Sequence, residues 1–208
     1  MVIVSAFALI QGLWILSAEL VRPGLGSERT TADRGEARKA RAKIAAAIGL
    51  VRADLWAEDA LIQSGFDTSS GNFSFIAPAS EMLAARAAAD RVLSSAPLQA
   101  QMWLLLAASA SSFGTESSGA AALEMAYLTA PQCPALIPPR LLIAARSSAL
   151  ADQSVQDFVR IDADYIFTKA PALKSAFLAA YWASLPENRP FLEQIAKANG
   201  QSLLPNLR

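Results

Sequence analysis

The chain of 208 residues contains no histidine and a single cysteine, Cys133. Without histidine it lacks the commonest general base and the commonest zinc ligand, and it cannot form a Ser–His or Cys–His catalytic pair. One cysteine excludes a disulfide within the chain. Its position between Gln132 and Pro134 is typical of an inert loop thiol rather than of a nucleophile. We therefore expect no enzyme, no metal and no cofactor.

Neither sign of charge is in excess, because 18 Lys and Arg residues balance 18 Asp and Glu residues. A neutral chain has no general electrostatic attraction to nucleic acid, and the sequence also lacks a glycine-rich phosphate loop. We expect no nucleic-acid partner. Apolar residues make up 53% and charged residues 17%, which excludes a disordered chain and a polytopic membrane protein. No stretch alternates as a strand does, so we predict an all-α fold.

One long apolar run stands out near the N-terminus. Residues 2–21 have only Gln11 and Glu19 as clearly polar interruptions. As a helix this run measures about 30 Å, the thickness of the hydrocarbon core of a bilayer. It predicts a transmembrane helix, with residues 1–26 as a membrane anchor. A cleaved signal peptide is disfavoured by the missing basic start and by the bulky Leu16 at the cleavage position. A helix buried in the protein's own core is a third alternative.

A charged stretch follows the apolar run. Residues 27–43 are predicted to form a stalk and the start of a long helix that ends near Ser64. Residues 44–200 are predicted to form a helical domain, and residues 201–208 a tail. The basic residues of the stalk would lie in the cytoplasm under the positive-inside rule. One apolar segment before one soluble domain is, in contrast, typical of export. We expect a bacterial-type inner-membrane protein with a periplasmic domain, and the cytoplasmic face is the alternative.

The most regular pattern lies in residues 100–133. The pair Ala96–Pro97 recurs as Ala130–Pro131. The spacing between these two pairs equals the length of a repeat unit of two short helices. Between the two pairs, small and large apolar residues occur at helical spacing, and small residues at Ala107, Ala110 and Gly119 predict that the two helices approach closely. The residues that carry the pattern are Trp103, Leu106, Ala107, Gly119, Leu123, Ala126 and Pro131. This stretch resembles one tetratricopeptide repeat.

The resemblance implies an α-solenoid of helical hairpins whose first helices line a concave groove for a protein or peptide. On that basis we expect partner contacts from Gln101, Trp103, Arg140 and Arg146. The pattern is weaker elsewhere, because the next such pair, Ala170–Pro171, comes later than the same period requires. An alanine-rich helical bundle whose helices end at Ala-Pro by chance is therefore the alternative architecture.

These features predict a membrane-tethered scaffold or assembly factor, and association with proteins of this kind points to envelope or polysaccharide biogenesis. The alternative is an accessory subunit of a larger membrane complex, held by its apolar helix. A neighbouring helix would then meet one set of small and polar residues, namely Ser5, Ala8, Gln11, Gly12 and Glu19. A third hypothesis is an enzyme that uses carboxylates alone, with Asp54 and Glu58 or Asp157 and Asp164 on shared helix faces.

Local signals also place the C-terminal helices. Pro138 and Pro139 suit the first turn of a helix, Asp152 or Ser154 suits the N-cap of the next, and Gly200 suits the residue after the last one. Aromatic residues crowd this third of the chain. We expect most of them in the core, and we expect any that are exposed to be binding anchors: Phe158, Tyr165, Phe167, Phe177, Tyr181, Trp182 and Phe191.

Overall fold

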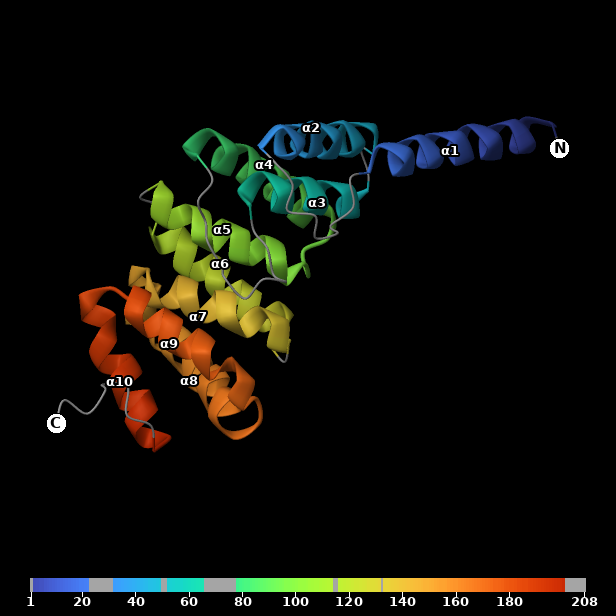
Figure 1. Ribbon diagram of the computed structural model, residues 1–208. Helices are drawn as coiled ribbons and strands as arrows, with labels where there is room; N and C mark the ends of the chain where they lie inside the picture. Colours follow the sequence, from blue (N-terminus) through green and yellow to red (C-terminus); the bar gives the residue numbers. More distant parts are fainter. Residues whose placement is uncertain are drawn as a thin grey trace. The chain divides into compact units, whose positions relative to one another are not determined.

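The computed structural model of the chain describes residues 2–22, 32–49, 52–65, 78–113, 116–131 and 133–200. Across these ranges the secondary structure consists of ten α-helices and four short 3-10 helices, with no strand (Figure 1). The predicted all-α class is confirmed. The predicted tail over 201–208 lies outside the described residues.

The helices belong to two compact units. Unit 1 contains α1 (Val2–Val21), α2 (Ala32–Ile48), α3 (Ala53–Ser64) and α4 (Ala79–Ser95). Unit 2 contains α5 (Ala100–Ser112), α6 (Glu116–Thr129), α7 (Ile137–Ala145), α8 (Gln153–Thr168), α9 (Lys174–Ala183) and α10 (Arg189–Ala198). The 3-10 helices of unit 2 are η1 (Pro134–Leu136), η2 (Ser148–Ala151), η3 (Pro171–Leu173) and η4 (Pro186–Asn188).

The prediction of one long helix from Ala32 to Ser64 is wrong, because α2 and α3 are separate helices. The break lies at Gly49, whose carbonyl accepts a hydrogen bond of 2.7 Å from the backbone N–H of Arg52. A Cβ atom on Gly49 would collide with the side chain of Leu55. Glycine thus lets α3 fold back onto α2, and the residues expected in one long helix are divided between two helices that pack together.

Unit 1 is built on α3 and α4, which pack side by side, with α2 against α3 and the end of α1 against α2. A small cluster of Ala18, Ala45 and Leu55 is buried where α1, α2 and α3 meet. An ion pair of 2.7 Å between Lys39 and Glu81 joins α2 to α4. Because the cluster contains two alanines, the three helices approach closely there.

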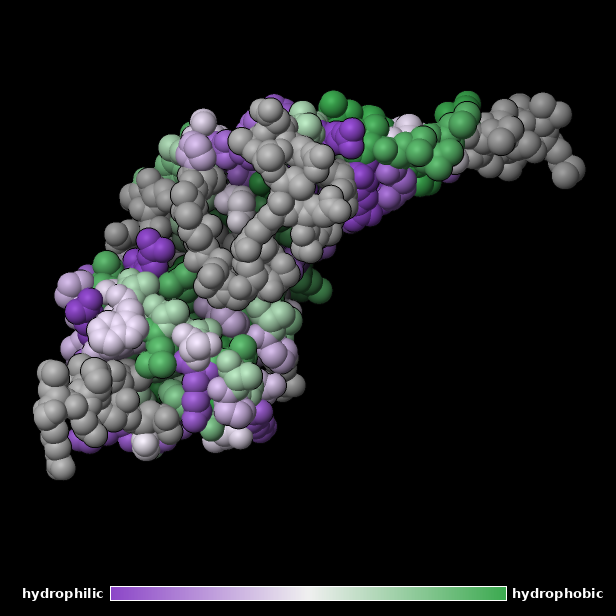
Figure 2. Space-filling model, in the orientation of Figure 1, coloured by the Kyte–Doolittle hydropathy of each residue, from purple (hydrophilic) through white to green (hydrophobic). Residues whose placement is uncertain are grey.

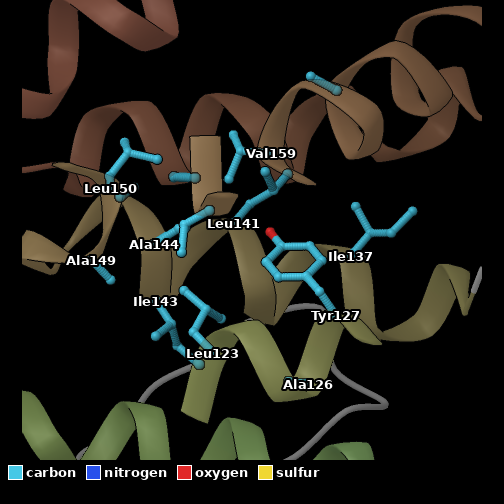
Figure 3. Close-up of a cluster of buried hydrophobic side chains, with 14 of the residues drawn as sticks. Leu123, Ala126, Tyr127, Ile137, Leu141, Ile143, Ala144, Ala149, Leu150 and Val159 are labelled. Atoms are coloured by element: carbon cyan, nitrogen blue, oxygen red, sulfur yellow. The ribbon is translucent and has the colours of Figure 1, made fainter. Parts of the chain in front are cut away.

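Unit 2 has a continuous apolar core to which each of its six α-helices contributes. The helices pack α5 on α6 and α7 on α9, with α8 against α6, α7, α9 and α10. Figure 3 shows side chains of α6, α7 and α8 meeting around Tyr127, near Ile137 and Leu141. The six helices form the successive pairs α5–α6, α7–α8 and α9–α10. The first helices of these pairs contact one another in order along the chain, and so do the second helices. This arrangement is compatible with a helical-repeat fold.

The α5–α6 hairpin confirms the close approach predicted for residues 100–133. A Cβ atom built on Gly119 would lie 2.8 Å from the Cβ of Ala110, a separation at which one of the two helices must move. Leu123 and Ala126 on α6 are buried on the face that the repeat pattern assigns to the core. The glycine is thus required by packing rather than by backbone conformation.

Gly119→Ala is expected to lower the free energy of unfolding by up to about 2 kcal/mol, because overpacking costs about 1–3 kcal/mol and the helix-propensity gain offsets only about 1 kcal/mol of that cost. Gly12→Ala in α1 is the matched control, since a Cβ there meets nothing within 4 Å. It should leave stability unchanged or raise it. Urea denaturation followed by circular dichroism measures both, and equal effects at the two positions would contradict the tight contact.

Candidate functional site

The exposed surface of α1 is the first candidate site. Large apolar side chains project into solvent along the helix, with exposed fractions of 50% or more: Ile10 66%, Leu13 65%, Ile15 50%, Leu16 53% and Leu20 78%. Figure 1 shows α1 leading away from α2 towards its N-terminal end, and Figure 2 shows its apolar surface beside the hydrophilic surface of the neighbouring helices. Exposed apolar surface of this kind is typical of a site that contacts lipid or protein.

The base of α1 is held to unit 1 by a charged cluster. The guanidinium of Arg22 donates to the carboxylate of Glu58, which is buried. Arg52 donates to Glu19 and to Asp54, each at 2.6 Å. The Arg52 guanidinium also lowers the pKa of the Asp54 carboxyl. Because this cluster joins α1 to α3 and to the turn before it, the last turns of α1 are fixed to unit 1.

One further bond anchors α1 halfway along. The indole N–H of Trp14 donates to the carbonyl of Ile48, at 2.7 Å, in the last turn of α2. That carbonyl is one of the groups that a helix leaves unpaired at its C-terminus. Trp14 therefore holds the middle of α1 against α2, whereas Ile10, Leu13 and Leu16 around it remain exposed.

In the part of the chain that the structure describes, no helix combines the length and the apolar character needed to cross a membrane. The prediction of a transmembrane helix over residues 2–21 is therefore not supported. Of the residues expected to face a neighbouring helix, Gln11 and Gly12 are exposed, and Glu19 pairs with Arg52. The side chains of Ser5 and Ala8 lie outside the described part.

The second candidate site in unit 2 consists of the partly exposed side chains of α5, Arg146 directly after α7 and the exposed side chains of α9. α7 itself is buried except for the half-buried Leu142. Gln101 and Trp103 on α5 are half-buried, and Trp103 packs against the core. Arg146, directly after α7, is exposed. Trp182 on α9 is 59% exposed, which makes it one of the exposed aromatic residues that were expected to be anchors. Partner binding by these residues stays a prediction.

Arg140 occupies a different place from the other predicted contacts, because its side chain is 0% exposed. It donates to Asp162 at 3.0 Å and to the carbonyl of Ala130 at 2.8 Å. Its guanidinium lies 4.6 Å from the centre of the Tyr127 ring, which stacks on Phe158. Arg140 therefore ties α7 to α6 and α8 inside the core. We assign it a packing role, and a role in partner binding remains untested.

Asp162 is the acid of this buried network. Burial raises its pKa to about 6, although the Arg140 guanidinium opposes the shift. The nearby Tyr127 hydroxyl also opposes the rise in the Asp162 pKa. It makes no hydrogen bond of normal geometry. A carboxyl whose folded pKa exceeds its unfolded value contributes stability that is fully present below about pH 4 and is lost as the pH rises through about 6.

The pH dependence of stability should therefore carry the signature of Asp162. Between pH 4 and pH 7, the unfolding free energy of the wild type minus that of Asp162→Asn is expected to fall by about 2–3 kcal/mol, at 1.36 kcal/mol per pKa unit. Urea denaturation of both proteins across this range measures the difference. A difference that grows with pH would mean that Arg140 dominates and lowers the pKa.

The other carboxylates that were considered for chemistry are engaged by arginines or by an amide. Asp54 is bound by Arg52, and Asp157 by Arg160 at 2.6 Å. Asp164 accepts a hydrogen bond of 3.2 Å from Asn199. Among the described residues, no group of three histidine, cysteine, aspartate or glutamate side chains could hold a metal ion. These contacts are those of structural polar pairs.

Comparisons with models of protein families, with curated proteins and with solved structures found no match to this chain. The candidate sites therefore stand on their own geometry. Sequence reasoning missed the charged cluster at the base of α1, because its partners lie far apart in the chain. It also missed that Arg146 lies beside the C-terminal end of α9. This proximity arises only when α7 and α9 pack.

Proposed function

We propose that this chain is a non-enzymatic interaction scaffold that associates with a membrane through α1 and binds a protein or peptide through the helix pairs of unit 2. The non-enzymatic part rests on the absence of histidine from the sequence. The binding part rests on the packing of successive first helices, which in helical-repeat proteins present a surface to a partner.

The observation that carries the proposal is the exposure of α1. Five of its large apolar side chains are half-exposed or more. Ile10, Leu13, Leu16 and Leu20 follow one another at three- and four-residue spacing and share one face of the helix, and Ile15 lies outside that face. Burying one such side chain is worth about 1.5–3 kcal/mol, so leaving all of them in water is costly. A lipid bilayer can cover every side of a helix at once, whereas a single protein surface covers one side.

The fixed base of α1 makes insertion geometrically simple. Residues 2–16 include the exposed Ile10, Leu13 and Leu16 and measure about 22 Å at 1.5 Å per residue, which is enough to reach into one leaflet of a bilayer. Insertion of this part requires no crossing of the bilayer.

Two earlier predictions remain part of this proposal. The role is that of an assembly factor in envelope or polysaccharide biogenesis, at a bacterial-type inner membrane. The helical units lie on the periplasmic face, with the cytoplasmic face as the alternative. The exposed side of α1 that carries Gln11 and Gly12 favours a second function, an accessory subunit of a membrane complex. An open glycine admits close approach of a partner helix.

Vesicle flotation of the full chain tests the proposal. The wild type should rise with the lipid, and a variant with serine in place of Ile10, Leu13 and Leu16 should remain in the aqueous fraction. Since these side chains are exposed, the substitutions should not unfold unit 1. A variant that still floats would overturn membrane association through α1.

A further inference from the structure

The outward face of α9 carries a stripe of three side chains at four-residue spacing, the distance at which residues share one face of a helix. These are Lys174, Leu178 and Trp182, and we call them the α9 stripe. Leu178 is 39% and Trp182 59% exposed. Ala179 and Ala183 beside them are also exposed, so the surface around the two large residues is low and open to an approaching helix.

The aromatic residue of the stripe is held in place from below. The Trp182 ring meets the ring of Tyr181 edge-on, with 5.2 Å between the ring centres. The Tyr181 hydroxyl donates to Glu193 of α10 at 2.6 Å, and Tyr181 is itself buried. An exposed tryptophan on a fixed support loses little freedom on binding, which is the property of residues that dominate interfaces.

Basic residues lie at both ends of α9. Lys169 and Lys174 are at its N-terminal end. At the other end the backbone N–H of Leu185 donates to Ala145 at 3.0 Å, which brings Arg146 beside the end of α9. Arg146 is exposed, and in the described part of unit 2 its guanidinium pairs with no carboxylate.

Two acids and one further base also lie near this end. Asn188 donates to the carbonyls of Ala145 and Ser147, each at 2.9 Å. These bonds hold its neighbours Glu187 and Arg189, both exposed, near Arg146. Glu193 of α10, which is also exposed, accepts the hydrogen bond of Tyr181, so the two acids balance Arg146 and Arg189 at this end. The apolar centre of the α9 stripe is thus bordered by the net positive charge of Lys169 and Lys174 at one end and by the exposed guanidinium of Arg146, among balanced charges, at the other.

We propose that the α9 stripe and Arg146 bind a short acidic amphipathic helix of a partner protein. Apolar side chains of that helix cover Leu178 and Trp182, and its carboxylates pair with Lys174 and Arg146. The stripe is about 12 Å long, which matches two to three turns of a partner helix. This inference rests on the proposed function, because it assigns the partner chemistry of the same helical surface.

Two synthetic fluorescent helices of equal length test it, with identical Leu and Phe faces but either Glu or Lys at both ends. Fluorescence anisotropy with the full chain should give a binding constant for the Glu peptide at least about tenfold stronger than for the Lys peptide, and weaker at high salt. Leu178→Asp and Arg146→Glu should each weaken the Glu peptide by about tenfold or more. Ile161→Asp, at an exposed position on α8, should change nothing.

Equal binding of the two peptides, binding of neither, or full binding by the Leu178→Asp variant would overturn the inference. Circular dichroism melts of each variant separate loss of binding from loss of fold. Failure here leaves membrane association through α1 intact, because vesicle flotation measures it separately. Loss of flotation with normal binding of the Glu peptide would instead overturn the membrane part of the proposed function and keep the α9 stripe.

Discussion

Replacing Asp162 by alanine is expected to lower the free energy of unfolding by about 3–5 kcal/mol, the largest stability effect we predict. The substitution leaves the Arg140 guanidinium, which is 0% exposed, without a counter-charge in the core. Its remaining contacts are the carbonyl of Ala130 and the face of Tyr127. A guanidinium cannot escape this cost by losing its proton, because it stays charged in proteins.

Arg140→Met should cost clearly less than Asp162→Ala. The carboxyl left behind can take up a proton, and burial already raises its pKa to about 6. Methionine also fills much of the volume of the arginine stem. The double variant Arg140→Met/Asp162→Leu removes both charges and should be close to the wild type or more stable.

Urea denaturation of the four proteins at pH 7 measures these differences. Far-UV circular dichroism before denaturation is the control for folded starting material. A cost below about 1 kcal/mol for Asp162→Ala would contradict a buried ion pair, because exposed pairs contribute about that much or less. So would a larger cost for Arg140→Met than for Asp162→Ala.

The elements that local patterns specify were predicted well. The apolar run over residues 2–21 is α1, and the hairpin over 100–133 is α5 and α6, with Gly119 at the predicted close approach. Asp152 accepts a hydrogen bond from the backbone N–H of Ser154 as an N-cap, and Gly200 has the positive φ of 69° expected after the last helix. Capping and turn chemistry act over a few residues, so the sequence displays them directly.

The features that depend on packing were not predictable. The stretch around Gly49 has the apolar spacing of one helix, and only the contact of Leu55 with the turn shows why it breaks. Arg140 lies in a predicted helix, but the choice between core and surface depends on α6 and α8 on either side. The partners of Arg22 and Arg52 come from separate helices, and their spacing in the chain reveals no pattern.

The second large effect is expected on membrane association. Moving Ile10, Leu13 and Leu16 from water into lipid should contribute several kcal/mol at about 1.5–3 kcal/mol for each side chain. Serine at all three positions removes that contribution. Since about 1.4 kcal/mol corresponds to a factor of ten, the partition of the chain into vesicles should fall at least about a hundredfold.

The matched control is a variant with serine at three exposed leucine and isoleucine positions of unit 2, namely Leu98, Leu128 and Ile161, which are 78%, 57% and 61% exposed. It removes a similar exposed apolar area from a surface to which we assign no lipid contact. This variant should therefore float as the wild type does, and its circular dichroism spectrum should match that of the α1 variant.

Flotation of the full chain with vesicles of phosphatidylcholine and phosphatidylglycerol is the measurement that tests the account most directly. The account predicts that the wild type and the unit 2 variant rise with the lipid, and that the α1 variant stays in the aqueous fraction while remaining folded. A wild type that stays in the aqueous fraction, or an α1 variant that rises as fully as the wild type, would contradict it.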